Sequence, residues 1–184
     1  MGMPMNNHRQ VSFDHELLIL VDKNDNELGF MPKAGCHRGD GILHRAFSIF
    51  IFNFAGELLL QRRSDEKTLW GGYWSNSVCS HPRKGESYEV AAARRLQDEL
   101  GVSAELEFRF RFQYQAKFRD IGAENELCSV FTGTHNGPFH INPTEISEIS
   151  FVLPEKLDEE IARSPEKFTP WFKLEWRRLR KIQV

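Results

Sequence analysis

SHPRKGESYEVAAARRLQDELGV, residues 80–102, joins a charged loop that contains a proline to a helical pattern closed by a glycine. Its second part, residues 87–100, is rich in alanine, and Gly101 stands where a left-handed residue commonly ends a helix. We therefore predict a helix over residues 87–100 with a loop on either side. Apolar side chains recur in it at helical spacing, at Val90, Ala93, Leu96 and Leu100.

Two acidic residues, Asp98 and Glu99, stand in the last turn of this predicted helix. The negative end of the helix dipole disfavours anions there by about 0.3–1 kcal/mol. Either Arg94 and Arg95, each four residues earlier, compensate through ion pairs, or a bound cation does. Surface ion pairs are the commoner arrangement in proteins, and the pattern alone leaves both alternatives open.

Short segments rich in β-branched and aromatic residues lie on both sides of the helix. The clearest is FRFRFQYQAKF, residues 108–118, in which aromatic residues from Phe108 to Phe118 alternate with polar ones and so share one face of a strand. Residues 154–167 and 171–183 predict two later helices. This order of elements predicts an α+β fold, with a mixed or antiparallel sheet flanked by helices. The other expected strands are residues 16–22, 45–52, 57–63 and 124–134.

The composition limits the domain count and the partners. With 184 residues, the chain is expected to form a single domain, with residues 1–15 as a flexible N-terminal segment. A formal net charge of −2 would gather neither nucleic acid nor an anionic membrane, and the longest apolar run, residues 46–52, is strand-sized. Three cysteines and an N-terminus without a secretory pattern favour a reduced, cytoplasmic protein. A monomer is the favoured state.

Carboxylates and imidazoles that could share a metal come from separate segments. Glu124 and Glu126 are two residues apart in a predicted strand, so both side chains project from one face. His37, His44 and His81 lie in loop or strand-edge contexts. Together these groups suit an octahedral Mn²⁺, Fe²⁺ or Zn²⁺, or Mg²⁺. The alternative is that the two glutamates face water at a strand end, which is the commoner position of acidic residues.

Residues 80–102 resemble the Nudix box, a loop-helix-loop that holds diphosphate through divalent metal, written Gx5Ex7REUxEExGU with U an aliphatic residue. Ser80 replaces the first glycine, and Asp98 stands at an acidic position. Arg95 replaces the glutamate that follows the arginine of the motif, and a guanidinium cannot ligate a metal. A multi-metal hydrolytic centre would therefore lack one of its main carboxylates. The positions that fit the motif are Glu86, Arg94, Leu96, Glu99, Gly101 and Val102.

The altered box is similar to that of the type I isopentenyl-diphosphate isomerases. The resemblance covers about residues 16–180. It implies a single Nudix-like isomerase domain that interconverts isopentenyl diphosphate and dimethylallyl diphosphate in isoprenoid biosynthesis. Other segments of that family occur in the same order, including PKAGCH at 32–37, NSVCSHP at 76–82, AENELCSVF at 123–131 and FTPWFK at 168–173.

The resemblance also implies roles for individual residues. Cys79 and Glu126 would be the two acid/base groups, and Tyr114 and Trp171 would lie beside the hydrocarbon of the substrate. Glu99 would hold a Mg²⁺ ion together with the substrate diphosphate. The ligands of a second ion, Mn²⁺, Zn²⁺ or Mg²⁺, would be His37, His44, His81, Glu124 and Glu126. The cations that bind the diphosphate would be Lys33, Arg63, Lys67 and Arg95.

The implied reaction explains why a thiol and a carboxylate are both needed. Moving a double bond along an isopentenyl chain adds a proton to one carbon and removes one from another, through a tertiary cation that water would capture. Trp171 can face that cation with its π-cloud, an interaction of about 2 kcal/mol or more when desolvated. Without the resemblance, Cys79 would be taken as a small buried hydrophobe and Trp171 as a core residue. Cys36 and Cys128 are interpreted as packing residues.

Two rival functions share some of these features. A Nudix pyrophosphohydrolase of nucleoside diphosphate derivatives would have the same fold, but Arg95 and the CSHP segment argue against it. A catalytically silent metal- or nucleotide-binding module would not need Cys79, the glutamate pair and Trp171 together. The sequence therefore favours the isomerase.

Overall fold

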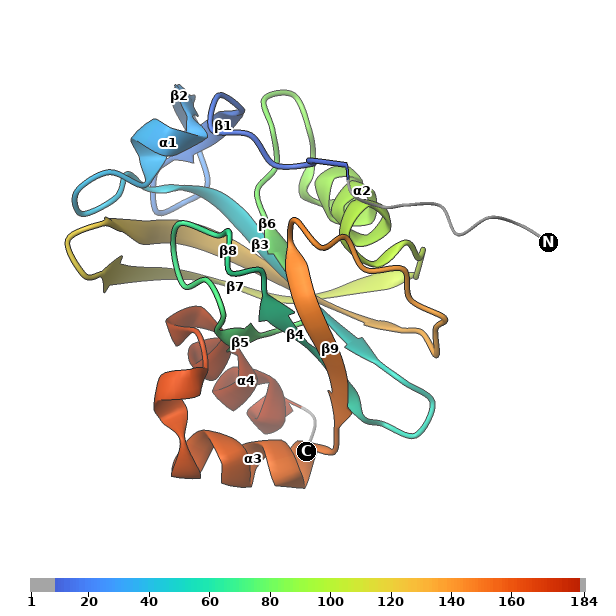
Figure 1. The fold of residues 1–184 in the computed structure, drawn as a ribbon. Coiled ribbons are helices and arrows are strands. Elements are labelled where there is room, and N and C mark those ends of the chain that lie inside the picture. The colour runs from blue at the N-terminus through green and yellow to red at the C-terminus, as the bar shows by residue number, and fades with distance from the viewer. Residues whose placement is uncertain (1–8, 183–184) are drawn as a thin grey trace.

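The computed structural model describes residues 9–182, which form a mixed β-sheet with helices on both faces (Figure 1). The strands are β1 (Leu17–Val21), β2 (Glu27–Pro32), β3 (His44–Phe52), β4 (Leu58–Arg63), β5 (Trp74–Ser75), β6 (Val78–Ser80), β7 (Leu106–Phe118), β8 (Gly122–Thr134) and β9 (Ile146–Val152). The helices are α1 (Lys33–Cys36), α2 (Tyr88–Leu100), α3 (Pro154–Arg163) and α4 (Pro170–Ile182), with a 3₁₀ turn at Pro165–Lys167.

Strand β3 lies at the centre of the sheet and brings distant segments together. It runs parallel to β8 along its whole length and antiparallel to β6 on its other side. Outside this parallel pair, the strands pair antiparallel: β1 with β2, β4 with β9, and β7 with β8. The predicted α+β fold with a mixed sheet is therefore confirmed.

Each face of the sheet carries its own hydrophobic core. On one face, α2 packs Ala92 and Leu96 against Phe47 of β3. On the other, Phe172 of α4 stacks on Phe50 of β3, with the ring centroids 5.9 Å apart. Full burial of such a side chain stabilises the fold by about 1.5–3 kcal/mol. Within residues 9–182, no helix is both long and apolar enough to cross a membrane.

Helix α2 begins and ends with the signals that its sequence predicts. The side chain of Ser87 accepts a hydrogen bond from the backbone N–H of Val90 at 3.3 Å, and Gly101 closes the helix with φ 68°. The predicted apolar face is wrong in part, because Val90 is 58 % exposed and Ala93 is also exposed. Small alanines let the helix lie close to the sheet on a different stripe. That stripe consists of Tyr88, Ala91, Ala92, Arg95, Leu96, Glu99 and Leu100.

Strand β7 departs from strict alternation at one point. Its register against β8 shifts between Phe108 and Phe110, so Arg109 is an extra residue in the ladder. Phe108 pairs with Phe131, whose side chain belongs to the core under α2, whereas Phe110 pairs with Val130 and packs on the α4 side. The prediction that all the aromatic residues of this strand share one face is therefore wrong for Phe108, because a β-bulge reverses the alternation.

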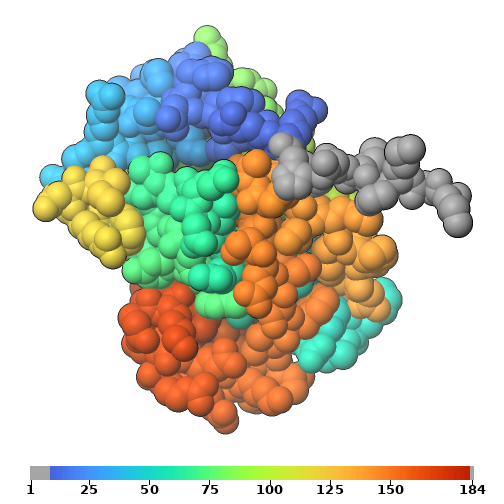
Figure 2. All heavy atoms as spheres, in the orientation of Figure 1, coloured from blue at the N-terminus to red at the C-terminus, as the bar shows by residue number. Residues whose placement is uncertain are grey.

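The chain that precedes β1 packs on the domain. Of the segment predicted to be flexible, residues 1–15, the first eight lie outside the described residues. Val11 is buried, and its carbonyl accepts a hydrogen bond from Arg95 at 2.9 Å. Asn142 donates to the carbonyl of Arg9 at 2.8 Å. Figure 2 shows this N-terminal part, in dark blue, lying across the top of the molecule against other segments.

Candidate active site

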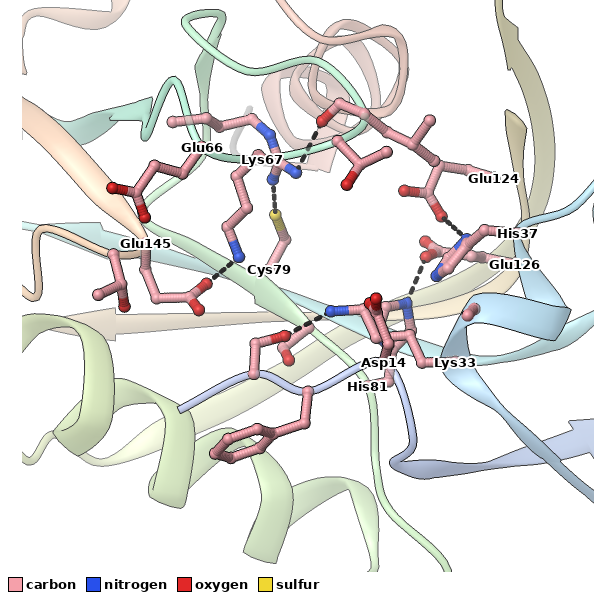
Figure 3. A pocket seen from close by; sticks show the side chains of 18 of the residues that line it. Asp14, Lys33, His37, Glu66, Lys67, Cys79, His81, Glu124, Glu126 and Glu145 are labelled. Carbon is pink, nitrogen blue, oxygen red and sulfur yellow. Dashed lines mark hydrogen bonds and ion pairs between the residues drawn. The ribbon is translucent and has the colours of Figure 1, made fainter. Parts of the chain in front are cut away.

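A pocket of about 750 Å³ opens between the N-terminal segment, α1 and the sheet (Figure 3). Its lining contains most of the side chains that the sequence singles out, from segments far apart in the chain. Two of the predicted site residues, His44 and Glu99, are buried behind that lining. The predicted residues that line the pocket are Lys33, His37, Arg63, Lys67, Cys79, His81, Arg95, Tyr114, Glu124, Glu126 and Trp171.

Three imidazoles and a carboxylate converge on one side of the pocket. A ligand atom from each of His37, His44, His81 and Glu124 lies within 4.8 Å of the others. The rings of His44 and His81 are 4.9 Å apart between centroids. Nitrogen and carboxylate donors in this number and spacing can surround one divalent ion of the kinds that accept such mixed ligands.

His44 shows that the cluster fits a cation. Its Nδ1 lies 2.6 Å from the carbonyl oxygen of Ile42, which can only accept, so Nδ1 is the donor and, in the neutral ring that can ligate, Nε2 carries the lone pair. Among the described residues, Nε2 has no hydrogen-bond partner, although it is buried. An unpaired buried acceptor costs about 1–3 kcal/mol. A divalent ion bound by the cluster would satisfy it.

Glu126 connects the cluster to the wall of the pocket. Its Oε1 lies 2.8 Å from Nε2 of His81 and 3.7 Å from Nε2 of His44. Its Oε2 accepts a hydrogen bond of 2.5 Å from the hydroxyl of Tyr114, which stands opposite in the β7–β8 ladder. Burial raises the pKa of Glu126, but His44 and the Tyr114 hydroxyl outweigh burial and the net pKa is lowered. The carboxylate is therefore ionised at neutral pH.

The histidines of the cluster differ in their tendency to take up a proton. Burial lowers the pKa of His81 well below the ordinary value, and the nearby His44 and His37 lower it further. Burial also lowers the pKa of His37, but Glu124, whose Oε2 is 3.0 Å from Nδ1, outweighs burial and raises the net pKa. His37 is consequently the first of this pair to be protonated as the pH falls.

Cys79 lies on β6, between the cluster of histidines and the basic side chains of the pocket (Figure 3). Burial raises the pKa of its thiol to about 12, although Arg63 opposes this shift. Nη1 of Arg63 lies 3.4 Å from Sγ, and the same guanidinium lies 5.2 Å from the centroid of the Trp171 ring. The thiol is therefore protonated at neutral pH, and the aromatic wall beside it already attracts a cation.

Basic side chains also line the pocket: Lys67 lies across it from the histidines (Figure 3), whereas Lys33 is near enough to His37 and His81 to lower the pKa of both. Nζ of Lys33 donates to the hydroxyl of Ser12, and Nζ of Lys67 donates to the carboxylate of Glu145. Burial lowers the pKa of Lys67 to about 8, because the attraction of Glu145 offsets burial only in part. This part of the pocket can therefore bind an anion such as diphosphate.

The two acidic residues in the last turn of α2 form ion pairs with the arginines of the same helix. Arg94 lies 3.7 Å from Asp98, and Arg95 lies 2.6 Å from Glu99. Ion pairs four residues apart thus compensate the two acids. Arg95 also lies 2.9 Å from Glu145, and its side chain is only 2 % exposed. Sequence reasoning missed Glu145, because the residue stands in a turn without a motif or a periodic pattern.

Comparison with known proteins agrees with the fold and the site. Residues 42–172 match the NUDIX domain, so the class of protein is a Nudix protein. The isopentenyl-diphosphate Delta-isomerase 1 of Photorhabdus laumondii is 45 % identical over 163 residues, which cover 88 % of this chain and 93 % of that protein. The isopentenyl-diphosphate Delta-isomerase of Serratia proteamaculans is 46 % identical, covering 85 % and 87 %. The chain belongs to the isopentenyl-diphosphate Delta-isomerase family.

A solved structure supports the fold independently. The crystal structure of DR0079 from Deinococcus radiodurans superimposes with a TM-score of 0.74 at 25 % identity, covering 89 % of this chain and 98 % of that one. The MutT protein from Methanosarcina mazei follows the same fold with a TM-score of 0.62 at 21 % identity, covering 77 % and 95 %. These structural similarities support the fold, whereas the family assignment rests on the sequence relatives.

Proposed function

We propose that the protein interconverts isopentenyl diphosphate and dimethylallyl diphosphate. The observation that carries this proposal is the presence of a protonated thiol, Cys79, and an ionised carboxylate, Glu126, in one pocket whose basic side can bind a diphosphate. Relatives of this chain carry the name of the same reaction. A hydrolase would have no use for the thiol.

The two groups exchange protons with different carbons of the substrate. A proton added to the terminal methylene carbon of isopentenyl diphosphate gives a tertiary carbocation, and removal of a proton from the neighbouring methylene places the double bond inside the chain. One group must start with a proton and the other without one. Cys79 and Glu126 satisfy this condition, and the reverse reaction exchanges their roles.

The aromatic residues protect the cationic intermediate. Trp171 and Tyr114 are almost fully buried and line the pocket, with their ring centroids 6.1 Å apart. Their π faces stabilise positive charge, and their bulk excludes the water that would capture it. Tyr114 also fixes the orientation of Glu126 through its hydroxyl.

A divalent metal would complete the site. The residues that would hold one ion, Mn²⁺, Zn²⁺ or Mg²⁺, are the three histidines and Glu124 of the cluster, together with Glu126, whose Oε1 faces His44 and His81. Bound there, the ion would orient Glu126 and tune its acidity. A Mg²⁺ ion with Glu99 would neutralise part of the diphosphate charge. The side chains that would bind the diphosphate itself are Lys33, Arg63, Lys67 and Arg95.

Incubation of the purified protein with isopentenyl diphosphate and Mg²⁺, followed by separation of the products, tests the proposal. We expect dimethylallyl diphosphate to appear without release of phosphate. Release of phosphate or nucleoside monophosphate from nucleoside diphosphate derivatives at a rival rate would instead identify a pyrophosphohydrolase. We further propose that the enzyme acts as a monomer in the cytoplasm, without nucleic-acid or membrane partners.

A further inference from the structure

Glu145 is a buried carboxylate that lines the pocket and has no part in the proton transfers proposed above. It immediately precedes β9 and is 4 % exposed. Its Oε2 accepts hydrogen bonds from Nζ of Lys67 and, at 2.9 Å, from Nη2 of Arg95; the first of these contacts is marked in Figure 3. One oxygen atom thus holds two of the cations that are expected to bind the diphosphate.

Backbone contacts fix Glu145 between the two segments that supply those cations. The N–H of Ser64 donates to the carbonyl of Glu145 at 2.9 Å, which ties the turn to the loop that carries the lysine. The N–H of Asn142 donates to the carbonyl of Glu99 at 2.8 Å, which ties the same turn to the end of α2, the helix that carries the arginine. The carboxylate is therefore held where both cations can reach it.

We infer that Glu145 is a positioning residue for the diphosphate: its carboxylate holds Lys67 and Arg95 side by side, so that both are in place when the substrate arrives. The inference rests on the proposed function, since it requires that a diphosphate binds on this side of the pocket. Glu145 acts through the two cations and does not have to touch the substrate.

The charges around Lys67 show what loss of this carboxylate would do. Burial is the largest cause that lowers the pKa of Lys67, and three neighbouring cations lower it further, whereas Glu145 raises it. Without the carboxylate, the lysine would lose its proton at a lower pH, and a neutral amine attracts a phosphate oxygen far less than an ammonium does. The charged groups that face Lys67 are Lys33, Arg63, Arg95, Glu99 and Glu145.

Binding of inorganic diphosphate, measured by titration calorimetry at one fixed magnesium concentration, tests the inference. At about pH 7.5, we expect Glu145→Gln to bind at least about threefold more weakly than the unsubstituted protein, because a fall of about one unit from a lysine pKa of about 8 lowers the protonated fraction from about three-quarters to about one-quarter. At about pH 6, where Lys67 is protonated in both proteins, only the positioning of the two cations is lost, and the difference should be less than about twofold. Glu148→Gln, on the exposed side of the same strand β9, is the matched control and should bind normally at both pH values.

A loss of affinity that is equal at both pH values, or no loss at either, would overturn the inference, since a merely structural role does not depend on the charge of Lys67. Lys67→Met gives a second measurement that does not require Glu145→Gln to fold. The affinity advantage of the unsubstituted protein over Lys67→Met should shrink as the pH rises through about 8, and a constant advantage also refutes the inference.

Isomerase assays run in parallel separate this inference from the proposed function. If the unsubstituted protein isomerises the substrate but Glu145→Gln binds diphosphate normally, only the inference is wrong. If the unsubstituted protein neither isomerises isopentenyl diphosphate nor binds inorganic diphosphate, the proposed function fails and the inference fails with it.

Discussion

Two side chains in opposite protonation states share the pocket. Burial holds the proton on the thiol of Cys79, whose pKa is raised to about 12, while His44 and Tyr114 hold Glu126 in its charged form. The pair is therefore prepared to give a proton at one carbon and to take one at another.

Replacement of Cys79 by alanine should remove one half of the exchange. We expect turnover of isopentenyl diphosphate to fall by about 10²–10⁴-fold, with the fold and the metal content unchanged. Cys36→Ala is the control for removal of a thiol, because Cys36 itself does not line the pocket and its thiol donates to the carbonyl of Met31, so turnover should stay nearly normal. Turnover of Cys79→Ala close to that of the unsubstituted protein would show that another group transfers the proton.

Glu124 and Glu126 should respond differently to the same change. Glu126→Gln keeps the shape of the side chain but cannot carry the proton, so turnover should fall at least about a hundredfold while most of the metal stays bound. Glu124→Gln should first lose metal, because its carboxylate belongs to the ligand cluster. Metal analysis and turnover on the same samples distinguish the two, and parallel losses in both variants would contradict the division of roles.

Metal binding should weaken in acid. A histidine must be neutral to ligate, and Glu124 raises the pKa of His37 against the effect of burial, so His37 is protonated before His81. Bound metal should therefore decrease as the pH falls, and the decrease should begin above the ordinary histidine pKa of about 6.5, because the pKa of His37 is raised. Metal retained on the protein after gel filtration at stepped pH gives the measurement. Full retention at about pH 5 would contradict it.

For single residues, the sequence predicts which side chains carry the chemistry better than it predicts which side chains contact one another. Cys79 and Glu126 stand in segments that can be matched to a family, so their positions could be named in advance. Glu145 could not, because its importance comes from a turn that meets two other segments only in the folded chain. The contact between Arg63 and the Cys79 thiol is of the same kind, since it depends on where two strands end.

Helix α2 places buried charges at the edge of the pocket. Its buried stripe contains Arg95 and Glu99 as well as apolar residues, so the helix serves the core and the site at once. The limits of the helix were predictable from Ser87 and Gly101, which act locally. The buried face of the helix was not predictable, because the spacing of Val90 and Ala93 fits a helix but does not show which of its faces packs against the sheet.

The end of α2 offers a test of how tightly the helix is held. Gly101 has φ 68°, and a Cβ there would come within 2.9 Å of Cβ of His140; Gly56, in the β3–β4 turn, has φ 78° but open space around it. Alanine at Gly56 should cost about 1–2 kcal/mol of unfolding free energy from backbone strain alone. Alanine at Gly101 should cost about 1–3 kcal/mol more from the clash. Urea unfolding measures the free energy of unfolding of both variants. Equal losses in the two variants would show that His140 shifts to make room for the added Cβ.

Strand β7 shows a second limit of pattern reasoning at the scale of elements. Alternation of aromatic and polar residues predicts the strand itself, and the paired strand β8 follows across the turn as expected. The bulge at Arg109 leaves no trace in that alternation. Its effect is to move Phe108 to the other face of the sheet, where its ring contacts Phe131, while Tyr114 keeps its place opposite Glu126.

The folded sheet brings segments that lie far apart in the chain to a single pocket. The parallel pairing of β3 with β8 sets His44 opposite Glu126, and the antiparallel pairing of β3 with β6 brings Cys79 to the same region. The fold is shared with proteins of other names, such as the MutT protein of Methanosarcina mazei. The function proposed for this chain therefore rests on the set of side chains at the pocket, and above all on the thiol.

Isomerisation in deuterated water shows whether the protein moves the double bond by adding one proton and removing another. Because an acidic group such as the thiol exchanges its hydrogen with the solvent, isopentenyl diphosphate incubated with the protein and Mg²⁺ in D₂O should give dimethylallyl diphosphate that carries deuterium in a methyl group, with no free phosphate in the same sample. Mass spectrometry of the product and a phosphate assay measure the two results. Unlabelled product, or phosphate released with no dimethylallyl diphosphate formed, would show that the protein does not isomerise the substrate by this proton exchange.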